Sequence, residues 1–401
     1  MPRPARLATW LAALILCAVA PAWAQITVPA PTTVLPPQEL QPSRPAPLTF
    51  TPSVSVFEEY NDNVFLDNRD RRSDWITGIA PGFALALQSE AYKLRVGYNF
   101  TAELYARESR LNEVFDRQNL YLDGTYRVAK ELTLSLTDYF IEDVNTNLVS
   151  ASGLATGRSR AWNNAVTPGV VWEPSPVWTL RFSGTYELQR FDERTLADSD
   201  VYRLRGAAER RLTGRLTGMA GYEFGFFDIA HEPSVVTHTP WLGARYRFTP
   251  TLTGSVSAGP TVTVEEGGST RLGPAVRAEL RQQFSLGSAS FGYDRTVTTA
   301  GGLGGTIDND SVTALLRIQK LARGLTVDFA PRYTHARSAD GRIDAHTWNV
   351  ALRSAYQATT WLSVYLGYAF FEQRSSTGGA GDIDQNRVSF GVQIGYPQTF
   401  D

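Results

Sequence analysis

The chain has 401 residues, and its 38 basic and 40 acidic residues give a net charge of −2. This balance, without a run of lysines and arginines, excludes a surface built to bind nucleic acid. The single cysteine, Cys17, lies near the N-terminus, so no disulfide can form within the rest of the chain.

Residues 1–24 have the three parts of a secretory signal peptide. MPRPAR is basic, LATWLAALILCAVA is an apolar run of 14 residues, and PAWA ends in Ala-Trp-Ala. The apolar run is shorter than the roughly 20 residues that a membrane-spanning helix needs. We therefore expect cleavage near Ala24-Gln25 and export of the mature chain.

Residues 25–50 are rich in proline, with seven prolines between residues 26 and 49. Such a composition rules out a packed core and favours an extended linker with polyproline II character. We expect a periplasmic linker. A passive spacer and a segment that docks a partner both remain open.

From residue 51 onward, apolar and polar side chains alternate with the period of a β-strand. Residues 92–105 and 177–189 show this alternation most clearly. Short turns and longer polar loops alternate between the strands. We predict 18 strands, at 53–66, 75–88, 92–106, 115–128, 131–143, 160–173, 177–191, 200–211, 214–228, 237–248, 251–264, 269–283, 287–298, 308–320, 324–336, 345–357, 361–373 and 385–396.

These strands predict an all-β, antiparallel, up-and-down transmembrane barrel over residues 51–401. A β-propeller needs four short strands per repeat, whereas this pattern has two strands of 12 to 15 residues per repeat. Strands of that length can cross a bilayer. Short turns are typical of the periplasmic side of an outer-membrane barrel and long loops of its outer side, and an even strand number places both termini in the periplasm.

Tryptophans at both strand ends support a membrane location, because aromatic rings favour the two interfaces of a bilayer. Three lie beside short turns, and three directly follow long loops. They are Trp172, Trp178 and Trp361, and Trp75, Trp162 and Trp348, respectively.

Side chains on the inward-facing parity carry more basic than acidic charge. An excess of arginine would attract an anionic solute or polymer into the lumen. A ladder of arginines that braces the inner wall through the acids is the alternative, and both remain open. Asp138 and Arg295 fall on the lipid-facing parity, which predicts a bulge or a rim position at each. The 14 inward basic residues are Lys93, Arg95, Arg127, Arg181, Arg203, Arg205, Arg245, Arg247, Arg277, Arg281, Arg317, Arg332, Arg353 and Arg387, against seven acids: Glu103, Asp123, Glu187, Glu209, Glu223, Glu279 and Asp328.

Signals for catalysis or metal binding are weak. The four histidines show no HExxH spacing, and no GxSxG stretch occurs. The glycine-rich residues 301–306 are followed by neither a lysine nor a helix, so they predict a loop tip rather than a phosphate loop. We predict no enzyme activity, no cofactor and no metal site. The histidines are His231, His238, His335 and His346.

The Asn61-Asp62-Asn63 triplet could be a metal site or the end of a strand. The stretch DNVFLDNRDRRSD lacks the glycine of a calcium loop and contains three arginines. We therefore interpret the triplet as the point where the first strand leaves the membrane. Because the first strand must close against the last, these side chains are candidates for sealing that junction.

Two stretches, EEYNDNVF at 58–65 and SDWITGIAPGFALAL at 73–87, resemble the start of the β-barrel porin 2 family. The resemblance implies an outer-membrane barrel associated with exopolysaccharide export. It also implies partnership with periplasmic polysaccharide-export proteins. The C-terminal strand resembles the signal that the barrel-insertion machinery reads. The motif residues are Tyr60, Asn61, Asp62, Asn63, Ser73, Asp74, Pro81 and Gly82.

We therefore expect a porin that gives an anionic exopolysaccharide passage across the Gram-negative outer membrane. A general diffusion porin for small anions is the first alternative, and an outer-membrane enzyme or structural anchor is the second. An 18-stranded barrel is wide enough for an aqueous channel unless loops fold into it. The loop at 144–159 is the longest and is our candidate for a constriction.

Overall fold

The computed structural model describes residues 47–400 apart from 269, 320, 378 and 379. The predicted signal peptide and residues 25–46 of the predicted linker lie outside these ranges. Residues 48–50, which the sequence assigns to the linker, belong to the first strand.

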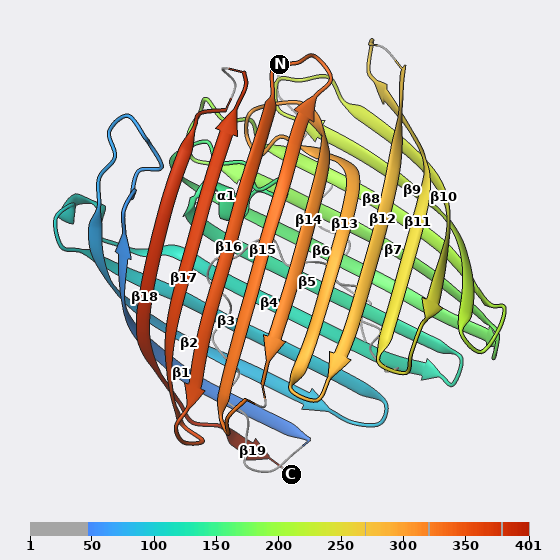
Figure 1. Cartoon of the computed structure of the whole chain (residues 1–401), viewed down its shortest axis with the longest axis horizontal. Coiled ribbons are helices and arrows are strands. Elements are labelled where there is room, and N and C mark those ends of the chain that lie inside the picture. The colour runs from blue at the N-terminus through green and yellow to red at the C-terminus, as the bar shows by residue number, and fades with distance from the viewer. Residues whose placement is uncertain (1–46, 269, 320, 378–379, 401) are drawn as a thin grey trace, which may run out of the picture.

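The described chain forms one closed antiparallel barrel of 18 strands (Figure 1). Each strand pairs with its neighbour in sequence, and β18 pairs with β1 to close the ring. A short strand, β19 (Gln398–Phe400), continues this closure against residues 48–50. The barrel strands are β1 (Leu48–Asn61), β2 (Asp74–Gln88), β3 (Tyr92–Tyr105), β4 (Glu113–Ala129), β5 (Leu132–Asn145), β6 (Arg158–Ser175), β7 (Trp178–Phe191), β8 (Ser199–Arg211), β9 (Leu216–Ile229), β10 (Val235–Arg247), β11 (Leu252–Glu265), β12 (Thr270–Phe284), β13 (Gly287–Thr299), β14 (Thr306–Ile318), β15 (Leu325–Ser338), β16 (Asp344–Gln357), β17 (Leu362–Ser375) and β18 (Ile383–Gly395).

The described chain has two short helical segments, η1 (Ser109–Leu111) and α1 (Thr146–Val149). Neither of them is long or apolar enough to span a membrane.

Every predicted strand except the first lies within two residues of an observed strand. The first was predicted at 53–66 but runs from Leu48 to Asn61. It ends there because the Asn61 Oδ1 accepts a hydrogen bond from the Asn63 backbone N at 2.9 Å, which turns the chain out of the ladder. Its early start was hidden by the surrounding prolines.

The barrel is polar inside and apolar outside. On β17, the inward Ser363 and Gln373 are at most 1% exposed, whereas the outward Leu366 is 56% exposed. Large apolar side chains are exposed on the outer face of many other strands. A closed barrel with an apolar exterior is the arrangement of a transmembrane barrel. Five of the six predicted interface tryptophans are exposed, as a membrane boundary requires: Trp75, Trp172, Trp178, Trp348 and Trp361.

One ladder of the barrel is incomplete. The pairing of β12 with β13 ends at Val276 and Arg295, although β12 stays paired with β11 up to Thr270 and β13 with β14 up to Thr299. Beyond this point β13 bends away from β12 (Figure 1). Val297 consequently packs in the interior against an apolar cluster from β8, β9 and β10.

The two polar residues predicted on the lipid face behave differently. Arg295 is the last residue of the β12–β13 ladder and approaches Asp310 to 3.5 Å, so it lies where the pairing of β13 with β12 ends. Asp138 lies at neither a bulge nor a rim, and that prediction is wrong. It pairs in regular register with Val166 and accepts a hydrogen bond from the Asn164 Nδ2 at 2.6 Å, which satisfies its polarity locally.

Candidate functional site

The loop between β5 and β6 crosses the barrel interior. Its helix α1 and the residues after it are buried, with Leu148 and Val149 at 1% exposure and Leu154 at 0%. Figure 1 shows α1 behind β16 and β17, within the outline of the barrel. The loop that was our candidate for a constriction therefore lies inside the lumen.

The loop is fastened to the opposite wall by hydrogen bonds. The backbone N and O of Ala155 both bond to the Gln373 side chain at 2.9 Å. The Arg332 Nη2 donates to the Ala151 carbonyl at 3.2 Å. Gln373 and Arg332 come from β17 and β15, so the loop spans the lumen from one side to the other.

A second inward segment fills the lumen from the other direction. The loop at 300–305 follows the bent end of β13, and Ala300 and Ile307 pack with Leu154 in one buried cluster. The Ala197 backbone N donates to the Gly302 carbonyl at 2.8 Å, which ties this loop to the loop after β7. The two inward loops therefore meet and narrow the lumen on the loop side of the barrel.

A buried ion-pair cluster, formed by Glu59, Glu103, Arg117, Asp143 and Arg387, lies beside α1. The Arg117 Nε lies 3.0 Å from the Glu103 Oε1 and 3.7 Å from the Asp143 Oδ2. Glu59 lies 3.8 Å from both arginines. All five side chains are at most 8% exposed, and four of them, together with Leu148, line a cavity of about 110 Å³. Charges this deeply buried must be paired to be tolerated, so the cluster is structural.

A smaller cavity of about 40 Å³ lies next to the bent end of β13. Three of the predicted arginines line it: Arg203, Arg205 and Arg277. Two carboxylates oppose them: Asp294 accepts from the Arg277 Nε at 2.6 Å, and Glu223 lies 3.7 and 3.9 Å from the other two arginines. We call these three arginines, with Glu223, Asp294 and Trp241, the arginine cavity.

Trp241 gives the arginine cavity an additional donor. The Arg205 guanidinium lies 5.3 Å from its ring centroid. Its buried Nε1 has no hydrogen-bond acceptor among the described residues. Thr237, Thr239 and other small polar side chains complete the lining. The cavity therefore offers guanidinium, indole and hydroxyl donors that converge on one small space.

Most of the other predicted lumen arginines brace the wall. Arg181 and Arg245 both bond to Glu209, at 3.0 and 2.9 Å, and Arg317 bonds to Asp328 at 2.7 Å. The bracing interpretation therefore describes these five residues. Arg95 and Arg281 pair with Asp123 and Glu279, Arg353 lies 4.8 Å from the ring centroid of Tyr365, and Lys93, Arg127 and Arg247 are exposed near the short turns.

Four charged residues of these sites were not among the predicted site residues: Glu59, Arg117, Asp143 and Asp294. Each lies on the inward parity of its strand, so the same alternation could have found them. Parity does not show which of the inward residues lie next to a loop that enters the lumen. That position distinguishes Arg117 from an arginine such as Arg127.

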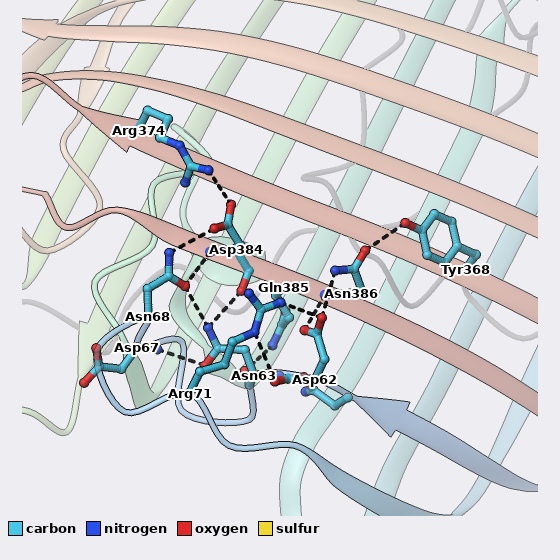
Figure 2. Close-up of polar contacts among 11 residues, drawn as sticks. Asp62, Asn63, Asp67, Asn68, Arg71, Tyr368, Arg374, Asp384, Gln385 and Asn386 are labelled. Carbon is cyan, nitrogen blue, oxygen red and sulfur yellow. Dashed lines mark hydrogen bonds and ion pairs between the residues drawn. The ribbon is translucent and has the colours of Figure 1, made fainter.

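Two residues of the motif, Asp62 and Asn63, lie at the junction that closes the barrel (Figure 2). Asn63 donates from its Nδ2 to the Asp384 carbonyl at 2.8 Å and accepts at its own carbonyl from Gln385 at 2.9 Å. Asn68 exchanges two hydrogen bonds with Asp384, at 2.9 and 3.0 Å. The loop after β1 is thus bonded directly to the start of β18, which confirms that these side chains seal the junction.

The other motif residues have local structural roles. Asp74 accepts from the backbone N of Arg107 and of Glu108 and so holds the neighbouring loop. The Tyr60 ring lies 5.3 Å from that of Trp75. A Cβ on Gly82 would lie 2.5 Å from the Tyr98 carbonyl oxygen, so only glycine permits this close approach of β2 and β3.

Comparison with known proteins gives no family. No family model matches the chain, and no curated protein matches it. Similar solved structures include OpdO of Pseudomonas aeruginosa (14% identity, 87% of this chain and 97% of that chain, TM-score 0.44). OccAB4 of Acinetobacter baumannii is 12% identical over 89% of this chain and 100% of that chain, with a TM-score of 0.46. OccK2 (OpdF) of P. aeruginosa in complex with glucuronate is 12% identical over 87% and 98%, with a TM-score of 0.45.

At these identities and scores, the fold rests on the strand pairing of this chain itself. The resemblance to the β-barrel porin 2 family stays a prediction.

Proposed function

We propose that this chain is an outer-membrane channel for small anionic solutes. The observation that carries the proposal is the arginine cavity, in which three arginines face two carboxylates and an indole N–H that has no acceptor among the described residues. Carboxylates and phosphates accept hydrogen bonds from such donors. An anion in this cavity would satisfy Trp241 and the excess arginine charge together.

The outer membrane is the compartment that fits a closed barrel with an apolar exterior. The apolar leader predicted at residues 1–24 would direct export of the chain to the periplasm, and the barrel-insertion machinery would fold it into the outer membrane. We propose a passive role without catalysis or a cofactor. Most of the lumen carboxylates for which contacts are described pair with arginines, as structural ion pairs do, and Glu187 accepts a hydrogen bond from the Asn163 Nδ2 at 2.9 Å.

Passage of an exopolysaccharide has less support than passage of a small anion. The loop at 146–157 and the bent end of β13 occupy the lumen and leave cavities of about 110 and 40 Å³. A polymer needs a continuous wide path, so both segments would have to leave the lumen at once. A small anion needs a narrower path, and therefore a smaller displacement of these segments. The proposal therefore requires no periplasmic export partner.

Ion selectivity of the purified barrel tests the proposal. We expect single channels in a planar bilayer, under a KCl gradient, to show a reversal potential that indicates chloride preference over potassium. A cation-selective channel would overturn the proposal. A deletion strain separates the two solutes: loss of surface polysaccharide with normal uptake of small anions would instead favour the polymer.

A further inference from the structure

Two histidines and an aspartate meet on the outer surface of the β15–β16 hairpin, near its loop end. His335 and His346 are direct cross-strand partners, and their rings stack with centroids 4.0 Å apart. The His335 Nε2 lies 2.9 Å from the Asp344 Oδ1. The inward neighbours Thr334 and Ala345 are almost fully buried, so the three side chains point away from the lumen.

The donor atoms are arranged as in a small metal site. One ligand atom from each side chain lies within 4.8 Å of the other two. Donors around a tetrahedral ion lie roughly 3.3 Å apart when the bonds are about 2.0 Å long. All three side chains are only half-buried at the surface. Small rotations of these side chains can therefore bring the donor atoms from within 4.8 Å of one another to roughly 3.3 Å.

The histidine His346 is already oriented for such a role. Its Nδ1 is hydrogen-bonded to the Tyr333 hydroxyl at 2.7 Å, which leaves its Nε2 for a ligand. Histidines that bind metals usually have their second ring nitrogen held in this way. Two imidazoles and one carboxylate suit zinc or copper, whereas magnesium and calcium prefer oxygen ligands alone.

The charges around the cluster do not prevent binding of a cation. Arg337 is the nearest basic residue in the sequence, and its Nη2 lies 3.4 Å from the Asp310 carboxylate. Arg374, the cross-strand partner of His346, lies 2.8 Å from both Glu372 and Asp384. Each guanidinium is therefore compensated by at least one acid, and Asp344 remains available to the histidines.

We propose that His335, Asp344 and His346 bind a divalent transition-metal ion, zinc or copper, on the outer rim of the barrel. The ion would join β15 to β16 beneath their connecting loop. Three protein ligands leave further coordination positions open to water. The site is separate from the lumen and does not depend on the proposed transport function.

The test is a titration of the full mature barrel, folded in detergent and purified without a histidine tag. ZnCl2 is added against a chromophoric chelator, and CuCl2 binding is followed by electron paramagnetic resonance. We expect one saturable site with two coordinated nitrogens, which magnesium and calcium do not occupy. Binding of several zinc or copper ions per barrel without saturation, or no binding at all, would overturn the proposal.

Variants locate the site and control for misfolding. His335→Ala and His346→Ala should each weaken zinc binding by at least about tenfold, and Asp344→Asn should weaken it while preserving the shape of the side chain. His238→Ala is the matched control, since His238 also bonds a tyrosine through its Nδ1 but lacks a second histidine. If His238→Ala loses as much zinc binding as the three site variants, the assignment is wrong. It is also wrong if folded Asp344→Asn and at least one of the two alanine variants bind zinc as well as the wild type.

Discussion

Asp62 accepts hydrogen bonds from both nitrogens of Asn386, from the backbone N at 2.7 Å and from the side-chain Nδ2 at 2.8 Å (Figure 2). The two residues are 324 positions apart in the chain. The Asp62 backbone N also donates to the Asn386 carbonyl at 3.1 Å. One aspartate just beyond β1 therefore continues the β1–β18 ladder and fastens the first strand to the last.

We expect Asp62→Ala to destabilise the closed barrel by about 1–3 kcal/mol, because it leaves the Asn386 donors without their charged acceptor. The measurement is the urea midpoint of folded protein, followed by the mobility shift between folded and unfolded barrel in electrophoresis. Asp70→Ala is the control, since Asp70 lies on the same loop but pairs only at the exposed surface. Equal midpoints for the wild type and Asp62→Ala would show that the ladder alone closes the ring.

Arg117→Met should lower the free energy of unfolding by about 3–5 kcal/mol, because it leaves buried carboxylates without their counter-ion. Glu103, at 1% side-chain exposure, would suffer most. The same urea denaturation measures the loss. Arg95→Met is the matched control: its pair with Asp123 is about half exposed, so a change within about 1 kcal/mol is expected. If both variants lose the same stability, burial of the ion-pair cluster does not determine how much it stabilises the barrel.

Gln373→Ala should release the loop at 146–157 from the far wall. The glutamine side chain makes two hydrogen bonds to Ala155 and one to the Gly381 carbonyl. Their loss should weaken docking of the loop by about 1–3 kcal/mol, which raises the population of undocked loop roughly five- to 150-fold. Single-channel recordings should show more frequent openings and larger conductance.

The control for this experiment is Gln189→Ala. Gln189 is an equally buried inward glutamine, on β7, and its Nε2 has no hydrogen-bond partner in the part of the chain that the structure describes. Its channel record should match the wild type. If Gln373→Ala also matches the wild type, the loop is held by its apolar contacts and not by this residue.

The double variant Arg203→Glu, Arg205→Glu should reverse the charge of the arginine cavity. At about 4 Å, one charge changes the energy of an ion by about 1 kcal/mol in water and about 4 kcal/mol at the effective dielectric of a protein, so the anion-to-cation permeability ratio should fall by at least roughly tenfold. Reversal potentials in a KCl gradient measure the ratio. Arg127→Glu, at the exposed end of β4, should change it far less. An unchanged permeability ratio in the double variant would mean that ions do not pass through the arginine cavity.

The strand pattern shows why so much of this fold was predictable. Side chains in a strand point alternately to the two faces, so the direction of Leu366 or Gln373 is decided by its immediate neighbours. The strand boundaries and the inward arginines followed from that rule. The end of the first strand was misplaced because the Asn61 side chain accepts from the Asn63 backbone N, and the alternation does not show this turn.

The candidate sites were less predictable, because they depend on partners far apart in the sequence. Arg117 on β4 meets Glu59 on β1 and Asp143 on β5 only once the wall curves into a barrel, and Ala155 reaches Gln373 over 218 positions. His335 and His346 show no metal-ligand spacing in the sequence, yet they face each other across a hairpin.

The sequence by itself determined the barrel class, 17 of the 18 strand positions to within two residues, and the side of the wall that residues in regularly paired strands face. These are local properties of a backbone with a two-residue period. Only the tertiary structure decided that the loop after β5 enters the lumen, that β13 leaves β12, and that Asp62 seals the ring against Asn386. Those outcomes arise from closure of the ring, which creates contacts that no local pattern encodes.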